Sequence, residues 1–306
     1  MAAKAFGFAM AALLVGRLAA AQAPAPQGSA PPDIKVVATS LGGNVYGIDG
    51  QGGRMAALVG PEGVFLVDAQ FPQVTEKIVA ALKGLSPAPL RFLVNTHVHG
   101  DHTGGNENFA RLGVTILGRP NLRGQLLKPR PAPGNGQVPP VASAAALPIV
   151  LFDTATTVYL DGETVRLIPL PPAHTDGDTA VKFEQADVLM TGDVFRSAGF
   201  PAAAVTNGGS VLGTIEALTQ LVALTGPGTK VVPGHGPVVD RAALIAHRDI
   251  AVTVRDRVAK ALREGKSAAD IRASKPTAEF EAKVGGPPNF ITQFVDGLIT
   301  ELSTTR

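Results

Sequence analysis

The sequence predicts an α/β protein, and three observations support this. Short apolar runs rich in β-branched residues alternate with segments of helical periodicity from Ile34 onward. Hydrophobic residues make up 45% of the 306-residue chain, which is enough to form a buried core. Histidine and aspartate side chains follow directly after several of the strand-like runs. We therefore expect one folded domain over residues 33–306, with strands that present their connecting loops together.

Residues 1–21 have the features of an export signal. Lys4 precedes an apolar run over residues 5–15, and alanines at 19–21 precede the expected cleavage point before Gln22. The apolar run is short for a membrane span, and a buried helix or an uncleaved anchor is the alternative interpretation. We expect a periplasmic or secreted protein with no stable membrane association after cleavage.

Residues 22–32 contain only Ala, Pro, Gln, Gly and Ser, a composition typical of a flexible leader. Without residues 1–21 the chain loses Lys4 and Arg17, so its 27 basic residues become 25, equal to its 25 acidic residues. A net charge of zero gives no indication of a nucleic-acid partner, and we expect a small-molecule substrate instead. The absence of cysteine excludes disulfide bonds.

Strand-like and helical segments follow one another in the first half of the chain. Strands are expected at residues 34–39, 55–59, 64–67 and 90–94, and a helix over about 73–83. The glycines of residues 50–53 mark a hairpin tip, which we expect to be mobile because glycine restrains the backbone little. Residues 120–140 contain six prolines and three glycines, too many for a helix or a central strand, so we expect a surface excursion there.

The second half begins with short strands and ends with helices. The expected strands lie at residues 150–152, 156–160, 164–168, 180–183, 188–190 and 230–232. Helical spacing is found over about 213–224, 241–263 and 290–302, and Ser267 is the expected N-cap of a further helix. His247 lies inside the long helix, away from any motif, and is interpreted as a surface histidine.

Four metal-seeking side chains lie within six residues, after the apolar run 90–94: His97, His99, Asp101 and His102. Imidazole and carboxylate are common zinc ligands, and the neighbouring glycines let the backbone bend so that several ligands face one point. Further candidate ligands follow other strand-like runs, namely His174, Asp193 and His235. Because packed sheets bring their loops together, the sequence predicts that these residues form one metal site.

These segments resemble the metallo-β-lactamase superfamily of zinc hydrolases. The matching segments are residues 95–106 (NTHVHGDHTGGN), 172–175 (PAHT), 191–193 (TGD) and 233–236 (PGHG), and the resemblance spans roughly residues 34–248. It implies an αββα sandwich, in which two mixed β-sheets pack face to face with helices on the outer faces. It also implies two zinc ions, the first held by His97, His99 and His174, the second by Asp101, His102 and His235, with Asp193 bridging them.

Two further residues are assigned by the same resemblance, and a third by the chemistry of its side chain. Asp68, at the end of the run 64–67, resembles a carboxylate that supports a ligand histidine, although a turn cap is the alternative. Arg196 occupies a place where some zinc β-lactamases hold the substrate carboxylate, and a solvated arginine is the alternative. Asn207 is a candidate donor to a developing oxyanion, with a turn residue as the alternative description.

The resemblance implies hydrolysis of a small ester, thioester or amide, with β-lactams among the candidate substrates. The zinc ions would generate hydroxide from water near neutral pH, and Asp101 would act as a catalytic residue that orients it. Several zinc β-lactamases carry cysteine where Asp193 stands, whereas lactonases and thioesterases of the glyoxalase II kind carry aspartate. The alternatives are therefore a lactonase or such a thioesterase, a persulfide dioxygenase with a single iron, and a non-catalytic zinc-binding protein.

Overall fold

The fold is described from a computed structural model, which covers residues 34–129 and 141–304. The expected export signal and leader lie outside these residues, as do residues 130–140 of the proline-rich segment. Within the described residues, none of the helices combines the length and the apolar character needed to cross a membrane.

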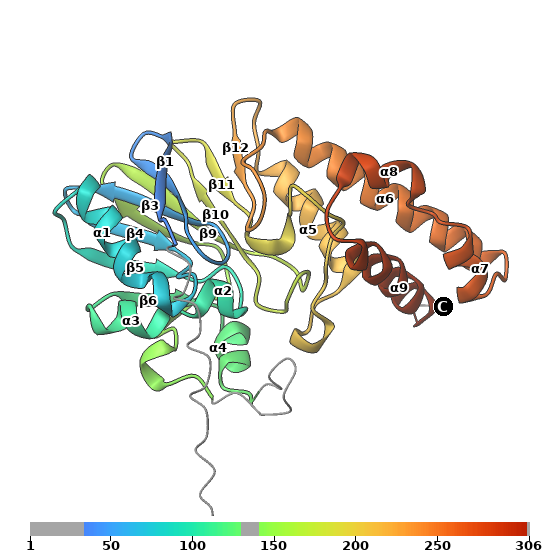
Figure 1. The fold of residues 1–306 in the computed structure, drawn as a ribbon, viewed down its shortest axis with the longest axis horizontal. Coiled ribbons are helices and arrows are strands. Elements are labelled where there is room, and N and C mark those ends of the chain that lie inside the picture. Colours follow the sequence, from blue (N-terminus) through green and yellow to red (C-terminus); the bar gives the residue numbers. More distant parts are fainter. Residues whose placement is uncertain (1–33, 130–140, 305–306) are drawn as a thin grey trace, which may run out of the picture. The chain divides into compact units, whose positions relative to one another are not determined.

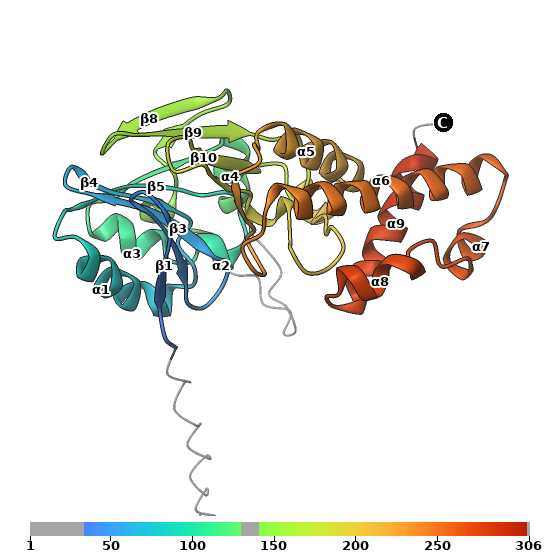
Figure 2. The ribbon, with the colours of Figure 1, turned by 90° about the horizontal axis from the view of Figure 1, so that it is seen from above.

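Two β-sheets pack face to face, and helices cover both outer faces (Figures 1 and 2), so the predicted αββα sandwich is confirmed. Among the described residues the first sheet has the order β1 (Val37–Gly42), β2 (Val45–Asp49), β3 (Met55–Gly60), β4 (Gly63–Val67), β5 (Leu90–Val94), β6 (Thr115–Gly118) and β7 (Val150–Leu151). The second has the order β12 (Lys230–Val232), β11 (Val188–Met190), β10 (Thr179–Phe183), β9 (Glu163–Pro169) and β8 (Thr156–Leu160).

Alternation along the strands builds the layers of the core. On β4, Phe65 and Val67 belong to the cluster between the two sheets, whereas Val64 and Leu66 belong to the cluster under the outer helices. Successive side chains of a strand point to opposite faces, so a strand that is apolar at every position is suited to a sheet buried on both sides. The sequence of β4 therefore fits a central strand.

Helices on the two outer faces close the sandwich. The first sheet is covered by α1 (Thr75–Leu85) and α3 (Asn106–Arg111), which share an apolar cluster with β3 and β4. The second is covered by α5 (Val211–Ala223), α6 (Arg241–Arg263) and α9 (Pro288–Thr304). Of these helices, α3 was not predicted and the other four were. Ser267 caps α7 (Ala268–Ala273) with a capping box, as predicted.

Several local predictions need correction. The strand expected at 34–39 is β1, which begins at Val37 and ends at Gly42, and the strands β2 and β6 were not predicted. The prediction of no helix over 120–140 is wrong at its start, because α4 (Pro120–Leu126) forms there. Pro120 occupies the first turn of α4, where a backbone N–H would have no partner within the helix, so proline is tolerated.

The hairpin tip between β2 and β3 is held in place by hydrogen bonds, so the expectation of few restraints is wrong. The Gly53 amide donates to the carbonyl oxygen of Asp101 at 3.0 Å, and the Gln51 amide donates to Oε1 of Gln70 at 3.1 Å. Gly53 is buried. The glycines serve close packing against the following loops rather than freedom of the backbone.

The strands that precede the candidate ligands end at one edge of the sandwich. β4 runs parallel to β5, and β11 runs parallel to β12. β9 and β11 are both antiparallel to β10 and therefore run in the same direction. At this edge the Thr179 amide donates to the Thr96 carbonyl at 2.8 Å, which joins the loop after β5 in the first sheet to β10 in the second.

The C-terminal helices are fixed to the second half of the sandwich. Glu301 of α9 accepts hydrogen bonds from the Ser210 hydroxyl at 2.7 Å and from the amides of Val211 and Leu212 at 2.7 and 3.0 Å, so it caps the N-terminus of α5. The backbones at Gly199 and Gly286 are in close contact, since a Cβ on Gly286 would lie 2.4 Å from the Gly199 Cα. These contacts anchor both ends of α9.

Candidate metal centre

The seven predicted ligands come from four loops at the shared edge of the sandwich. The loop after β5 and the short helix α2 (Gly100–Thr103) carry four of them, His97, His99, Asp101 and His102. The other three follow β9, β11 and β12, namely His174, Asp193 and His235. The structure brings their side chains together in three overlapping groups: His97, His99 and His174; His97, His102 and Asp193; Asp101, His102 and His235.

The first group consists of three imidazoles. Nδ1 of His99 lies 3.1 Å from Nε2 of His97 and 2.9 Å from Nε2 of His174. His174 donates from Nδ1 to the carbonyl oxygen of Ala202 at 2.5 Å, so its Nε2 carries the lone pair. Ligand atoms on a tetrahedral zinc ion lie about 3.3 Å apart, so this spacing fits a shared cation.

Asp101, His102 and His235 are called the second group below, and they combine imidazole and carboxylate. Oδ2 of Asp101 lies 3.1 Å from Nε2 of His235 and 3.7 Å from Nε2 of His102. The Asp101 side chain is 26% exposed and the His235 side chain 29%, whereas His102 is fully buried. This half of the centre is therefore the more open one, and Asp101 faces the solvent-accessible side.

Asp193 contacts both groups. Its Oδ2 lies 3.6 Å from Nε2 of His174 in the first group and 3.4 Å from Nε2 of His235 in the second, and its Oδ1 lies 3.3 Å from Nε2 of His102. Oδ1 of Asp193 and Nε2 of His102 are buried and lack hydrogen-bond partners within the described residues. Buried polar atoms are seldom left unpaired, so this pair fits residues that hold a cation.

Burial and charge shape the protonation of the centre. Burial, followed by the neighbouring His102, holds the pKa of His97 well below its usual value, and burial with His174 lowers the pKa of His99 to about 4. Burial would also lower the pKa of His102, but the charges of Asp68 and Asp193 hold it well above the usual value. His97 and His99 are thus kept neutral and able to coordinate, while the carboxylates attract positive charge to His102.

Hydrogen bonds that the His235 ring donates to Asp101 and then to Asp193 raise the pKa of His235 to about 9. The pKa of Asp193 lies well below its usual value, because its histidine neighbours, His102 foremost, outweigh the effect of burial. In the protein without metal, protonated histidines therefore balance the carboxylates. A bound cation would replace those protons, so metal binding is expected to release protons to the solvent.

Asp68 contacts a candidate ligand, His102, without being a candidate ligand itself. It is fully buried, its Oδ2 lies 2.8 Å from Nδ1 of His102, and it accepts from the Thr96 hydroxyl at 2.8 Å and the Thr96 amide at 2.7 Å. Its φ of 67° places it in the left-handed region, which is uncommon outside glycine. The bond to Nδ1 directs Nε2 of His102 toward Asp193, as expected for a carboxylate that orients a ligand.

Replacement of Asp68 by asparagine is expected to weaken zinc binding by about 10- to 100-fold. Asparagine keeps the volume and tolerates a positive φ, but it loses the charge that holds the His102 ring. Zinc affinity is measured by competition with a chromophoric chelator, and folding by circular dichroism. Asp161→Asn is the matched control, since Asp161 also has a positive φ, of 51°, and lies in the turn between β8 and β9. Unchanged zinc affinity in folded Asp68→Asn would contradict this role.

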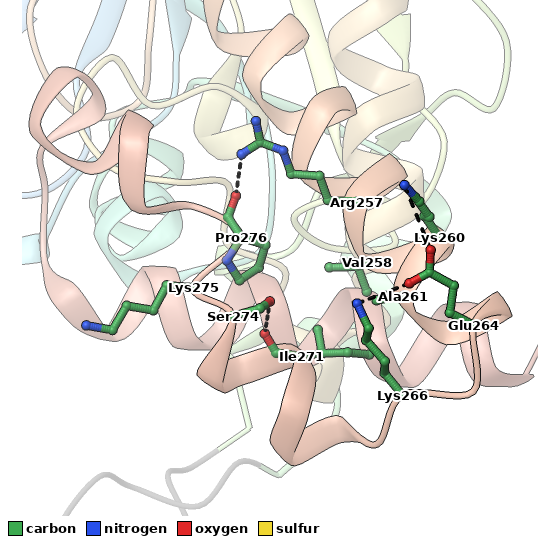
Figure 3. Close-up of a pocket in the computed structure, with 10 residues that line it drawn as sticks. All are labelled: Arg257, Val258, Lys260, Ala261, Glu264, Lys266, Ile271, Ser274, Lys275 and Pro276. Carbon is green, nitrogen blue, oxygen red and sulfur yellow. Dashed lines mark hydrogen bonds and ion pairs between the residues drawn. The ribbon is translucent and has the colours of Figure 1, made fainter.

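A cavity of about 580 Å³ opens onto the ligand cluster. Five predicted ligands reach its surface, together with Arg196 and several residues that the sequence did not single out: Ala202, Ala203, Ala204, Val205, Thr206, Phe290 and Gln293. A separate hollow between α6 and α7 (Figure 3) has four basic side chains in its lining, of which Arg257, Lys260 and Lys266 have ion-pair partners. There Arg257 donates to the Pro276 carbonyl at 2.9 Å, and Lys266 lies 3.0 Å from Glu264.

Two predicted site residues outside the ligand set differ in their distance from the centre. Arg196 donates to Oδ2 of Asp193 at 2.9 Å, so its guanidinium is engaged with the centre. Asn207 ends a short 3-10 helix (Val205–Asn207) and is not among the described residues lining the cavity.

The prediction of a surface His247 is wrong, because its ring is buried against Phe195 and burial lowers its pKa to about 4. Its spacing from Leu244 and Ala251 on α6 is that of the buried stripe, a signal that the sequence contained.

Comparisons with known proteins agree with this geometry. Residues 49–235 match the family model of the metallo-beta-lactamase superfamily. The chain is 28% identical over 179 residues to the Caenorhabditis elegans beta-lactamase-like protein 2 homolog, covering 58% of this chain and 53% of that protein. It is 30% identical over 171 residues to the hydroxyacylglutathione hydrolase of Anaeromyxobacter dehalogenans, covering 56% of each chain. The chain thus spans about half the length of the curated relatives it matches.

Among solved structures, a metallo-beta-lactamase from Pontibacter korlensis superposes with a TM-score of 0.60 at 20% identity, over 71% of this chain and 99% of that one. This likeness concerns the fold. The family match covers more than half of the chain and includes all seven candidate ligands. The chain belongs to the metallo-beta-lactamase superfamily.

Proposed function

We propose that this protein is an exported zinc hydrolase with two ions per chain, which cleaves a small ester, thioester or amide. The observation that carries the proposal is Asp193, whose carboxylate contacts a group of three histidines on one side and the Asp101, His102 and His235 group on the other. Family membership supports a hydrolase. Export rests on the sequence of residues 1–21 alone.

Zinc bound by these residues would supply a Lewis acid and lower the pKa of water. The chain itself would position the reactants. Asp101 reaches the cavity surface, and its Oδ2 can orient water there and accept a proton. The Ala202 carbonyl fixes the tautomer of His174, and Asp68 fixes that of His102. Water adds to the acyl carbon, the bond to oxygen, sulfur or nitrogen breaks, and the leaving atom takes a proton.

The direct test is elemental analysis combined with a substrate panel. The panel contains nitrocefin, a penicillin, an acyl homoserine lactone and S-lactoylglutathione, each offered to the zinc-loaded, chelated and reloaded protein. We expect about two zinc ions per chain, activity on at least one compound, loss on chelation and recovery on reloading. Asp101→Asn is expected to lower turnover by about 10²- to 10⁴-fold, with folding unchanged.

Other outcomes would favour the alternatives. One iron per chain together with oxygen consumption would replace the hydrolase by a persulfide dioxygenase. Zinc binding without turnover on any ester, thioester, lactone or lactam would indicate a zinc-binding protein. Full activity after exhaustive chelation, with no metal by elemental analysis, would refute the proposal.

A further inference from the structure

One wall of the cavity over the ligands is apolar and uncharged. It is formed by the consecutive residues Ala202, Ala203, Ala204 and Val205 and by Phe290 at the start of α9. These side chains offer methyl groups and an aromatic ring, with the amide of Gln293 as a polar group beside them. A surface of this composition binds apolar groups and disfavours charge, because a carboxylate placed against it would lose water without gaining a partner.

Arg196 is the single arginine or lysine among the described residues that line this cavity. Part of its guanidinium is already engaged. Its guanidinium donates to Oδ2 of Asp193 at 2.9 Å and lies over the Phe290 ring, with 4.9 Å between its central carbon and the ring centroid. Its side chain is 17% exposed. The carboxylate of Asp193 therefore offsets much of the positive charge that a substrate carboxylate would meet at Arg196.

The wall is held by backbone contacts as well as by side chains. The Gly199 amide donates to the Val284 carbonyl at 3.0 Å, just before α9. A Cβ on Gly199 would lie 3.2 Å from the Phe290 ring, so the glycine allows the ring to approach the loop that follows Arg196. Phe290 therefore has a defined position over the cavity, which favours selection by shape.

We propose that this wall selects neutral substrates with an apolar acyl group, which packs against Phe290 and Ala202–Ala204, and that it disfavours substrates carrying a carboxylate beside the bond that is cleaved. This inference rests on the proposed hydrolase function and adds its substrate class. Phe290 is then a specificity-determining residue, although it lies outside the segment that matches the family. Neutral lactones, esters and thioesters fit this class, and penicillins do not.

The test measures binding apart from turnover, with two inert ligands that differ in one group. N-butanoylglycinamide is neutral, whereas N-butanoylglycine carries a carboxylate one carbon from the amide nitrogen, beside the bond that would be cleaved. Isothermal titration calorimetry is run on the zinc-loaded and the metal-free protein, and NMR checks that both ligands stay intact. We expect the neutral compound to bind at least about tenfold more tightly in both forms.

Phe290→Ala is expected to weaken binding of the neutral compound by about tenfold, since roughly 50 Å² of apolar contact is lost. Phe280→Ala is the matched control. Phe280 also lies under an arginine, with 5.1 Å between the Arg257 guanidinium carbon and the ring centroid, but it does not line the cavity. This control is expected to leave both affinities unchanged, and circular dichroism checks that each variant is folded.

Equal or tighter binding of the carboxylate compound at the cavity would overturn the inference. So would unchanged affinity for the neutral compound in folded Phe290→Ala. Binding of an anion at the basic hollow of Figure 3 is recognised because Phe290→Ala leaves it unaltered. If the neutral preference holds while the substrate panel shows no hydrolysis, the proposed function fails and the assignment of the wall stands.

Discussion

Asp193→Asn is expected to lose at least one of two bound zinc ions and to lower turnover on the order of 10³-fold or more, because residues that act as one unit fail together. The carboxylate is 5% exposed and contacts histidines of both groups. Asparagine keeps its volume, but a neutral amide is a weaker ligand for zinc and no longer offsets the charge of two cations. Elemental analysis after dialysis gives the number of bound zinc ions per chain, and turnover is measured with the best substrate of the panel.

The matched control for Asp193 is Asp187→Asn. Asp187 precedes the same strand, β11, at its other end, and pairs with Lys182 rather than with a histidine. It is expected to keep both zinc ions and full turnover. If Asp193→Asn retains two tightly bound ions, the carboxylate does not bridge, and the assignment of the two groups to one dinuclear centre is wrong.

Gly53→Ala is expected to displace His102 and with it the second zinc ion. A Cβ on Gly53 would lie 2.1 Å from Cε1 and 2.2 Å from Nε2 of His102, far inside van der Waals contact. The ring has nowhere to move, because it is fully buried and its Nδ1 is held by Asp68 at 2.8 Å. Overpacking of this kind typically costs about 1–3 kcal/mol of the free energy of unfolding.

Zinc stoichiometry by competition titration and thermal unfolding measure the effect of this substitution. The control is Gly100→Ala, since Gly100 lies inside the ligand run and a Cβ there meets no atom within 4 Å. We expect near-normal stability and two zinc ions for Gly100→Ala, and about one ion for Gly53→Ala. If Gly53→Ala binds two ions with unchanged affinity, the hairpin tip has moved to make room for the added methyl group, and the prediction is wrong.

The candidate ligands could be singled out from the sequence because their signal is local. His97, His99, Asp101 and His102 lie within six residues, and the remaining three candidates directly follow strand-like runs. The direction of the strands then determines which loops lie together, and the family resemblance predicted that two sheets pack face to face. The structure brings all seven side chains together at the edge where parallel strands end.

The features that were not predicted depend on contacts between distant segments or on short elements. β6 has four residues and α4 has seven, and the prolines that follow α4 masked its helical pattern. The hairpin tip looked unrestrained because the partner of Gly53, the Asp101 carbonyl, lies far along the chain. The cavity wall joins Ala202–Ala204 to Phe290, and helical periodicity alone does not say which face of α9 meets a cavity.

Phe290 lies outside the segment that carries the candidate ligands. The proposed selection of substrate therefore depends on a different part of the chain from the metal centre. All seven candidate ligands lie within residues 49–235, whereas α9 spans Pro288–Thr304. We therefore expect substitutions in α9 to change selectivity while the ligand loops stay intact. In laboratory evolution, random libraries confined to the last 17-residue helix would be the economical route to new substrates.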